Sequence, residues 1–341
     1  MATSLNMGAT QHRAPKPLSR ERHGYYSLPI RLNPDHPGGP PMKLVRFSTQ
    51  GQAPRLGAIQ GERIADLQAS LAATLTRRGV VRAQELAASL IPASTRQFLE
   101  GGVVSREAVA SITEWVTVDR GAARLHAPIT DPGKFICIGL NYRDHAEEAG
   151  QPIPKEPPIF AKWANAIIDP GEPILRPRGS NALDWEVELG VVIGRTARYV
   201  PREQALDYVA GYTIINDVSA RDFQFITSQW MTGKIFETAA PVGPYIADRE
   251  EIADPHVLAL KTFVNGKQMQ NGNTKTFIFD VTYLVSYLSK LMTLSPGDLI
   301  ATGTPPGVGF AMKPPVALQP GDVCRLEITG LGVLENPIKD A

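Results

Sequence analysis

The sequence predicts an α+β fold in which β-strands dominate, and three observations support this. After about residue 130, short apolar segments recur between glycine, proline and asparagine residues, which is typical of a curled, mixed or antiparallel sheet. One amphipathic segment, 280–292, repeats apolar residues at helical spacing and is expected to lie on that sheet. Residues 42–125 begin with short strand candidates and continue as helical segments, which predicts a small α+β unit.

The chain is expected to have three parts. Residues 1–41 contain seven prolines and five basic against two acidic residues, so they bury too little apolar surface to order and predict a flexible, proline-rich arm. A small N-terminal α+β domain, 42–125, and a strand-rich domain, 126–341, follow. In the small domain we expect strands at 43–47 and 56–59 and helices at 67–75, 81–90, 94–99 and 105–116, the last starting at Ser105.

Composition excludes several classes of protein. The 341 residues include 35 basic and 34 acidic side chains, so no strong field draws the chain to nucleic acid or to an anionic membrane. The two cysteines, Cys137 and Cys324, lie in apolar runs and predict neither a disulfide framework nor a cysteine metal site. Neither a membrane-spanning run of about 20 residues nor a secretory signal is visible, so we expect a cytoplasmic protein.

Three carboxylates predict a metal site. In a strand over 183–193, the alternation of side chains places Glu186 and Glu188 on one face, with Cβ atoms roughly 6 to 7 Å apart. Such a pair is also common on the solvated face of a half-buried strand. Asp217 ends a second strand candidate, 211–217, where it either points into a shared cleft or caps the strand. Three carboxylates without clustered histidine or cysteine suit Mg²⁺, Mn²⁺ or Ca²⁺, with positions left for a chelating substrate.

Two polar groups follow Asp217 along the chain. If the segment is helical, Arg221 and Gln224 share its face, and Arg221 either binds a substrate carboxylate or pairs with Asp217 or Asp222. Lys234 is a candidate for holding an anionic group or an enolate oxygen, although an isolated lysine is usually solvated. These residues extend the predicted site beyond its metal ligands.

His145 and Glu148 are a candidate acid–base pair. They lie three residues apart after the strand candidate 135–138, so on a helix they face the same way and the carboxylate orients the imidazole as a general base for water. The alternative is a histidine on a helix surface. His126 and His256 show no comparable acidic partner in the sequence. The glycine-rich segment 296–309 offers backbone N–H groups and the hydroxyls of Thr302 and Thr304, but its spacing matches no nucleotide-binding loop.

An ordered set of motifs resembles the fumarylacetoacetate hydrolase family across roughly 130–338. The motifs are Gly139-Leu-Asn-Tyr-Arg-Asp-His145, Trp185-Glu-Val-Glu-Leu-Gly190, Asn216-Asp-Val-Ser-Ala-Arg-Asp222, Gly233-Lys-Ile-Phe-Glu-Thr238 with Pro241-Val-Gly-Pro244, Val264-Asn-Gly266 and Gly297-Asp-Leu-Ile-Ala-Thr-Gly-Thr304. The resemblance implies a mixed β-roll catalytic domain, 126–341, beside the small N-terminal domain. It implies the following residues: metal ligands Glu186, Glu188 and Asp217; a His145–Glu148 dyad on a lid; an active-site Lys234; and substrate-side Tyr142, Arg221, Gln224 and Thr304.

The resemblance also sets the expected activity. Where eukaryotic fumarylacetoacetases carry an extra acidic ligand before the tyrosine, this chain has Leu140-Asn141, so the acylpyruvate hydrolase, isomerase and decarboxylase branches fit better. We expect a Mg²⁺- or Mn²⁺-dependent hydrolase, with Ca²⁺ as a possible substitute, that cleaves a C–C bond in an acylpyruvate- or fumarylpyruvate-type 2,4-dioxo acid. The alternatives are an isomerase or decarboxylase of 2-oxo or 2-hydroxydiene dicarboxylates, as in bacterial aromatic catabolism and including oxaloacetate, a ureidoglycolate-lyase-like enzyme, or a metal-stabilised binding protein. A homodimer is expected.

Overall fold

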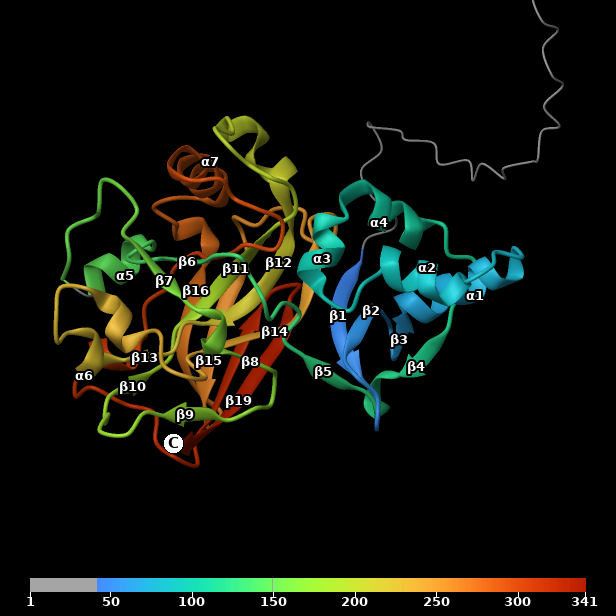
Figure 1. Ribbon diagram of the computed structural model, residues 1–341. Coiled ribbons are helices and arrows are strands. Elements are labelled where there is room, and N and C mark those ends of the chain that lie inside the picture. Colours follow the sequence, from blue (N-terminus) through green and yellow to red (C-terminus); the bar gives the residue numbers. More distant parts are fainter. Residues whose placement is uncertain (1–41, 149) are drawn as a thin grey trace, which may run out of the picture. The chain divides into compact units, whose positions relative to one another are not determined.

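One large sheet contains twelve strands within residues 42–148 and 150–341, the part of the chain that the computed structural model describes (Figure 1). The predicted arm, 1–41, lies outside the described residues. Strand β5 (Arg124–His126) pairs with β1, and β8 (Ile167–Ile168) pairs with β14. The other strands, in order across the sheet, are β4 (Thr117–Asp119), β3 (Arg63–Asp66), β2 (Arg55–Gln60), β1 (Lys43–Ser48), β14 (Ala240–Asp248), β12 (Val209–Asn216), β11 (Val187–Ile193), β17 (Leu299–Ala301), β6 (Phe135–Ile138) and β7 (Ile159–Lys162).

The first part of the chain packs four helices beside strands β1 to β3: α1 (Leu67–Arg77), α2 (Ala83–Leu90), α3 (Thr95–Glu100) and α4 (Gly102–Ala110) (Figure 1). Asp66 caps α1 by accepting a hydrogen bond from the N–H of Ala69, and Ser94 caps α3 in the same way. The helix expected to start at Ser105 begins earlier, at Gly102. Gly102 has φ +57°, and the left-handed turn that this glycine allows separates α3 from α4.

Strand β1 connects this part to the rest of the molecule. It pairs with β2 on one side, and on the other it pairs with both β14 and β5. Lys43 lies opposite Ala247, and Leu44 lies opposite Ile246, in an antiparallel register. The segments 42–125 and 126–341 therefore share a sheet.

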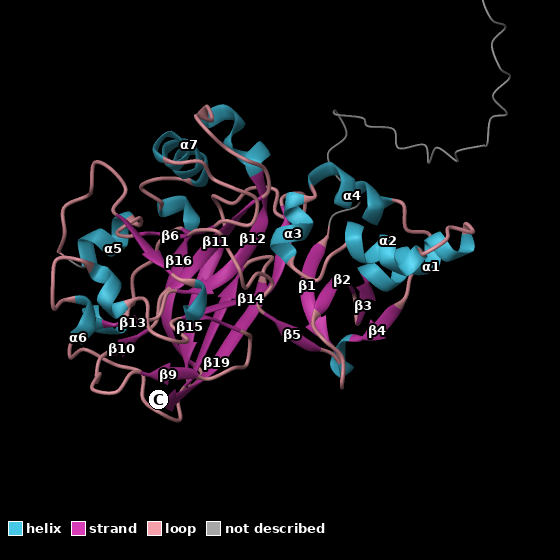
Figure 2. Ribbon diagram, in the orientation of Figure 1, coloured by secondary structure: helices cyan, strands magenta, loops and turns pink. Residues whose placement is uncertain are grey.

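A second sheet packs on the first and closes the main core. Its strands are β16 (Lys267–Asn273), β15 (Ala259–Val264), β18 (Val323–Ile328), β19 (Gly332–Asp340) and β9 (Ile174–Arg176), in this order (Figure 2). Val187 and Ile214 of the large sheet and Leu260 and Leu326 of the second sheet belong to one buried apolar cluster. Mainly β architecture with few helices confirms the predicted α+β fold.

The amphipathic segment expected at 280–292 forms helix α7 (Val281–Leu291). Asp280 caps it, and its apolar face, which includes Leu284, Val285 and Leu288, is buried in the main core. In residues 42–148 and 150–341, no helix is both long and apolar enough to cross a bilayer. The remaining elements are α5 (Arg143–Glu148), β10 (Leu183–Asp184), β13 (Ser219–Ala220) and α6 (Arg221–Gln224), and the 3-10 turns at Arg120–Ala122, Ala164–Ala166, Arg202–Tyr208, Trp230–Gly233, Thr274–Thr276 and Gly309–Ala311.

Candidate active site

Three buried carboxylates meet where strands β11 and β12 come together. Glu186 lies in the break between β10 and β11, Glu188 lies in β11, and Asp217 follows the last residue of β12. The antiparallel register and a hydrogen bond from the Asp217 N–H to the Glu186 carbonyl, 3.0 Å, bring the two segments together. One oxygen of each side chain lies within 4.8 Å of the other two. The structure thus assembles the three predicted ligand candidates.

Cations surround two of these carboxylates. Lys234 Nζ lies 2.8 Å from Glu186 Oε2 and 2.9 Å from Asp217 Oδ2. Arg221 donates to Glu186 Oε1 at 2.6 Å. Glu188 differs, because no described lysine, arginine or histidine forms an ion pair with it, and its one hydrogen bond comes from the N–H of Gly303, 2.8 Å away. Glu188 is therefore a buried carboxylate without an ion-pair partner among the described residues.

Lys162 of β7 is a buried cation that sequence reasoning missed. Its ammonium donates hydrogen bonds to three backbone carbonyls, those of Val218 (3.1 Å), Lys234 (2.6 Å) and Ala239 (2.8 Å). It also lies 2.8 Å from Asp217 Oδ1. The ammonium of Lys162 thus forms a buried ion pair with Asp217 Oδ1 while it also binds backbone carbonyls. A single lysine at the end of a short strand is usually exposed, so no local pattern indicates this role.

The pKa values of these groups follow from burial and charge. Burial raises the pKa of Glu186, but Lys234 and Arg221 outweigh burial and lower the pKa to about 2. Burial, followed by the charges of Asp217 and Glu186, raises the pKa of Glu188 well above its ordinary value. Burial lowers the pKa of Lys162 although Asp217 opposes it, whereas for Lys234 the nearby carboxylates outweigh burial and raise the pKa.

The residues present fit a hard divalent cation. The converging donors are carboxylate oxygens alone, which suits Mg²⁺, Mn²⁺ or Ca²⁺ rather than zinc. Glu188 is a buried carboxylate without an ion-pair partner among the described residues, and its hydrogen bond comes from the Gly303 N–H. A cation held by Glu186, Glu188 and Asp217 would balance its charge.

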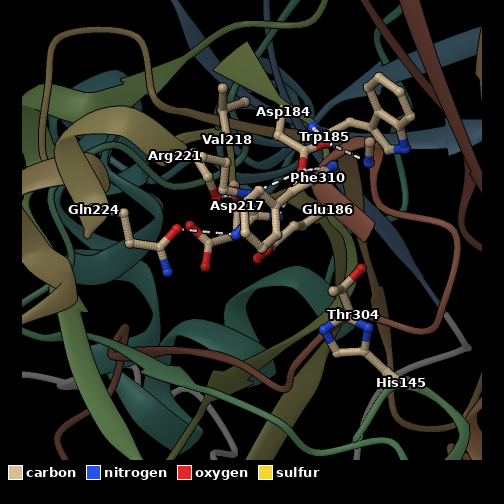
Figure 3. Close-up of polar contacts among 12 residues, drawn as sticks. His145, Asp184, Trp185, Glu186, Asp217, Val218, Arg221, Gln224, Thr304 and Phe310 are labelled. Atoms are coloured by element: carbon tan, nitrogen blue, oxygen red, sulfur yellow. Dashed lines mark hydrogen bonds and ion pairs between the residues drawn. The ribbon is translucent and has the colours of Figure 1, made fainter. Parts of the chain in front are cut away.

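Arg221 and Gln224 begin and end the short helix α6, and they contact each other as the predicted helical spacing requires. Arg221 Nη1 donates to Gln224 Oε1 at 3.0 Å, and both side chains are buried. The acidic partners of Arg221 are Asp184, 2.8 Å from Nε, and Glu186, rather than Asp217 or Asp222 (Figure 3). Arg221 thus holds the ligand candidate Glu186 in place through an ion pair. The break between β10 and β11 allows Asp184 and Glu186 both to contact Arg221.

The expected acid–base pair forms on α5. His145 Nδ1 lies 3.2 Å from Glu148 Oε2, as the three-residue spacing predicted. Glu148 also accepts hydrogen bonds from the Gly307 N–H at 3.0 and 3.1 Å. Figure 3 shows the imidazole of His145 on the Thr304 side of the carboxylate cluster. Asn141 fixes the chain before the helix through bonds to Phe279 and Thr302 carbonyls.

Thr304 and Tyr142 are buried next to these groups. Thr304 donates to the Val187 carbonyl at 3.0 Å and accepts from Gln270 Nε2 at 2.8 Å. Gln270, which sequence reasoning also missed, uses its side-chain oxygen to accept from the Val187 N–H at 3.1 Å. The Tyr142 hydroxyl has no hydrogen-bond partner among the described residues, and burial raises its pKa well above the ordinary value.

Two other histidines do have acidic partners, contrary to the expectation from sequence. His126 Nδ1 lies 2.6 Å from Asp169 Oδ2, and its Nε2 lies 2.8 Å from the Ser48 hydroxyl. His256 Nδ1 lies 2.8 Å from Asp254. Asp169 is 43 residues from His126 along the chain, so only the fold brings the pair together.

Comparisons with known proteins identify the family of the chain. The family model "Fumarylacetoacetate (FAA) hydrolase C-terminal" matches residues 134–339. The mitochondrial oxaloacetate tautomerase of Xenopus laevis is 42% identical over 304 residues, 87% of this chain and 90% of that protein. The fumarylacetoacetate hydrolase structure from Exiguobacterium antarcticum has a TM-score of 0.73 and 34% identity, covering 88% and 100% of the two chains. A maleylpyruvate hydrolase from Sphingobium with manganese(II) and pyruvate has a TM-score of 0.68 and 28% identity over the same shares.

Proposed function

Since the chain belongs to the fumarylacetoacetate hydrolase family, we propose that it is a divalent-metal-dependent hydrolase that cleaves a C–C bond in an acylpyruvate- or fumarylpyruvate-type 2,4-dioxo acid. One observation carries the proposal: the buried carboxylates of Glu186, Glu188 and Asp217 converge within 4.8 Å, and Glu188 has no ion-pair partner among the described residues, while His145 is paired with Glu148 on α5. The site thereby combines a cation site with a candidate base. The solved relative with manganese(II) and pyruvate supports the class of ligand.

Glu186, Glu188 and Asp217 would hold Mg²⁺ or Mn²⁺, with Ca²⁺ as a substitute. When bound, such an ion supplies Lewis-acid polarisation to the carboxylate and keto oxygens of a 2-oxo acid. The protein prepares this site by pairing two of its carboxylates with Lys234, Lys162 and Arg221 and leaving the third unpaired. Asp184 also pairs with Arg221, so four carboxylates face three cations, and the one negative charge that remains favours the cation.

His145 performs the proton transfer in this proposal. Glu148 holds Nδ1–H, so Nε2 is the basic nitrogen that removes a proton from water. The water oxygen bonds to the distal carbonyl carbon of the 2,4-dioxo acid. Breakage of the adjacent C–C bond yields a carboxylate and a pyruvate-type enolate, which takes up a proton to give pyruvate. Lys234 and the loop carrying Thr304 stabilise the enolate charge, and Arg221, Gln224 and Tyr142 contribute to the substrate side.

A second candidate is tautomerisation or isomerisation of a 2-oxo dicarboxylate such as oxaloacetate. The 42% identity to a protein named an oxaloacetate tautomerase favours it. This reaction moves a proton between carbon and oxygen and needs no attacking water, so His145 would act on a substrate C–H bond. Decarboxylation, or a ureidoglycolate-lyase-like reaction, would use the same cluster.

The test is a side-by-side assay of acetylpyruvate, fumarylpyruvate and oxaloacetate with Mg²⁺ or Mn²⁺ in ¹⁸O-labelled water. Hydrolysis places one solvent oxygen in the new carboxylate, whereas tautomerisation changes only the keto–enol ratio. His145→Ala should lower kcat by about 10²- to 10⁴-fold while the Mn²⁺ dissociation constant stays unchanged. Full hydrolysis by this variant would show that His145 is not the base. Turnover that persists after complete removal of metal would contradict the metal-dependent mechanism.

The remaining expectations accompany the proposal. We propose a homodimer that acts in the cytoplasm on a small-molecule substrate, without a nucleic-acid or membrane partner. The near-balance of 35 basic and 34 acidic residues supports the absence of a polyanionic partner. The described arrangement of His145, Glu148 and Lys234 favours an enzyme over a metal-stabilised binding protein.

A further inference from the structure

The glycine-rich loop 303–310 is bound along its length by the segment that carries two of the ligand candidates. The segment 184–188 and the loop run antiparallel, so Glu188 binds the start of the loop and Asp184 binds its end. The bonds join Glu188 to the Gly303 N–H (2.8 Å), the Val187 carbonyl to the Thr304 hydroxyl (3.0 Å), the Trp185 indole to the Gly307 carbonyl (3.1 Å), and Asp184 to the N–H groups of Gly309 (2.7 Å) and Phe310 (3.0 Å).

Gly307 is the point where this loop meets the lid helix. Its carbonyl accepts from Trp185, and its N–H donates to both oxygens of Glu148. Gly307 has φ +100°, and a Cβ there would lie 2.1 Å from the Met269 carbonyl oxygen, so glycine alone fits. The backbone of this residue thus connects a buried indole to the carboxylate that holds His145.

We propose that Trp185 is a positioning residue for the His145–Glu148 pair. The indole N–H fixes Gly307, the N–H of Gly307 holds Glu148, and Glu148 holds Nδ1 of His145. Trp185 is fully buried and adjoins Glu186, so the segment that presents the ligand candidates also sets the position of the base. This inference rests on the proposed acid–base role of His145.

The chain of contacts explains why α5 needs an anchor outside itself. The helix spans only six residues, Arg143–Glu148, which is too short to be stable alone. Its neighbouring loop bears the exposed Lys155, a trypsin site, and Glu156, which accepts from the Tyr283 hydroxyl at 3.1 Å. Loss of the Trp185 bond should therefore loosen the lid and displace His145 without changing the ligand candidates.

Trp185→Phe, which keeps an aromatic ring and removes the N–H, tests this in the Mn²⁺-loaded enzyme. We expect kcat to fall about 5- to 10-fold, the size of one lost buried hydrogen bond, with the Mn²⁺ dissociation constant within twofold of the original. With Mn²⁺ and pyruvate present, trypsin should cleave at Lys155 several-fold faster. Trp115→Phe, at an exposed tryptophan outside the site, is the matched control and should change neither kcat nor the rate of trypsin cleavage.

A double-mutant cycle separates positioning from a general structural effect. If Trp185 acts through Glu148, Trp185→Phe causes no further loss of kcat in a Glu148→Ala background, whereas additive losses would overturn the proposal. The cycle uses whichever of the 2-oxo acids turns over. If none of them turns over, the hydrolase proposal fails. The proposed role of Trp185 is tested separately, because an unchanged rate of trypsin cleavage in Trp185→Phe would overturn it. Trp185→Tyr, which also lacks the indole N–H, replaces the first variant if that one does not fold.

Discussion

Replacement of Lys162 by methionine tests the electrostatics of the site most directly. The ammonium is fully buried, lies 2.8 Å from Asp217 Oδ1 and donates to three backbone carbonyls. Methionine has a similar length and an apolar, adaptable side chain, so the substitution removes the charge and the donors while largely keeping the packing. The change in stability therefore reports the polar contacts.

The structure sets the expected magnitude. Removing one partner of a buried ion pair typically costs about 3 to 5 kcal/mol, because the other charge stays buried. Burial lowers the pKa of Lys162, against the effect of Asp217, so part of the gain from the ammonium is already offset by desolvation. Lys234 still neutralises Asp217 from the other oxygen. We therefore expect about 3 kcal/mol, which corresponds to a Tm lower by roughly 4 to 5 °C for a chain of this size.

The assay is thermal and urea unfolding of Lys162→Met in EDTA, beside the parent protein. Lys290→Met, at an exposed lysine of α7, is the matched control and should shift Tm by less than about 2 °C. A Lys162→Met protein as stable as this control would refute the reasoning that the buried ammonium balances Asp217. Saturating Mn²⁺ should recover part of the loss, because the cation also balances that carboxylate.

Two further changes test the charges around the fold. Glu188→Gln should raise Tm in EDTA, because it removes a buried charge that has no ion-pair partner among the described residues. The same substitution should abolish the rise in Tm that Mn²⁺ causes. If Mn²⁺ still raises Tm in this variant, Glu188 is not a ligand. Burial raises the pKa of Asp248 to about 6, so its contribution to stability is present below about pH 4 and lost as the pH rises through about 6. Asp248→Asn should make the free energy of unfolding fall by about 1 kcal/mol less over this pH range, a figure that already allows for the half-exposed position of the side chain. The measurement is urea unfolding at several pH values. If the two proteins show the same pH dependence, the prediction is wrong.

The sequence predicted those features that depend on local spacing. Glu186 and Glu188 alternate along one segment, His145 and Glu148 lie one helical turn apart, and the apolar repeat of 281–291 marks a helix. In each case the periodicity of the backbone determines which side chains meet, so neighbouring residues suffice. The family motifs then placed Asp217 with the two glutamates.

Features that depend on long-range pairing were not predictable in this way. Lys162 meets Asp217 although β11, β17 and β6 lie between β7 and β12 in the sheet order, and Asp169 meets His126 across 43 residues. Arg221 was expected to pair with an acid near it in the sequence, but the β10–β13 pairing brings Asp184 to it instead. Such partners are selected by strand order and register, which no single segment encodes.

The shared sheet also limits how the protein can be divided. A fragment that starts near Ala127 would remove β1 from the outer edge of β14 and leave the backbone groups around Ile246 and Ala247 without their neighbour. An open edge of this kind readily pairs with another copy, so such a truncation would favour aggregation rather than a minimal catalytic core. The smallest piece able to fold independently therefore has to retain Lys43–Ser48, and swapping the helical part between relatives would require cutting after this strand.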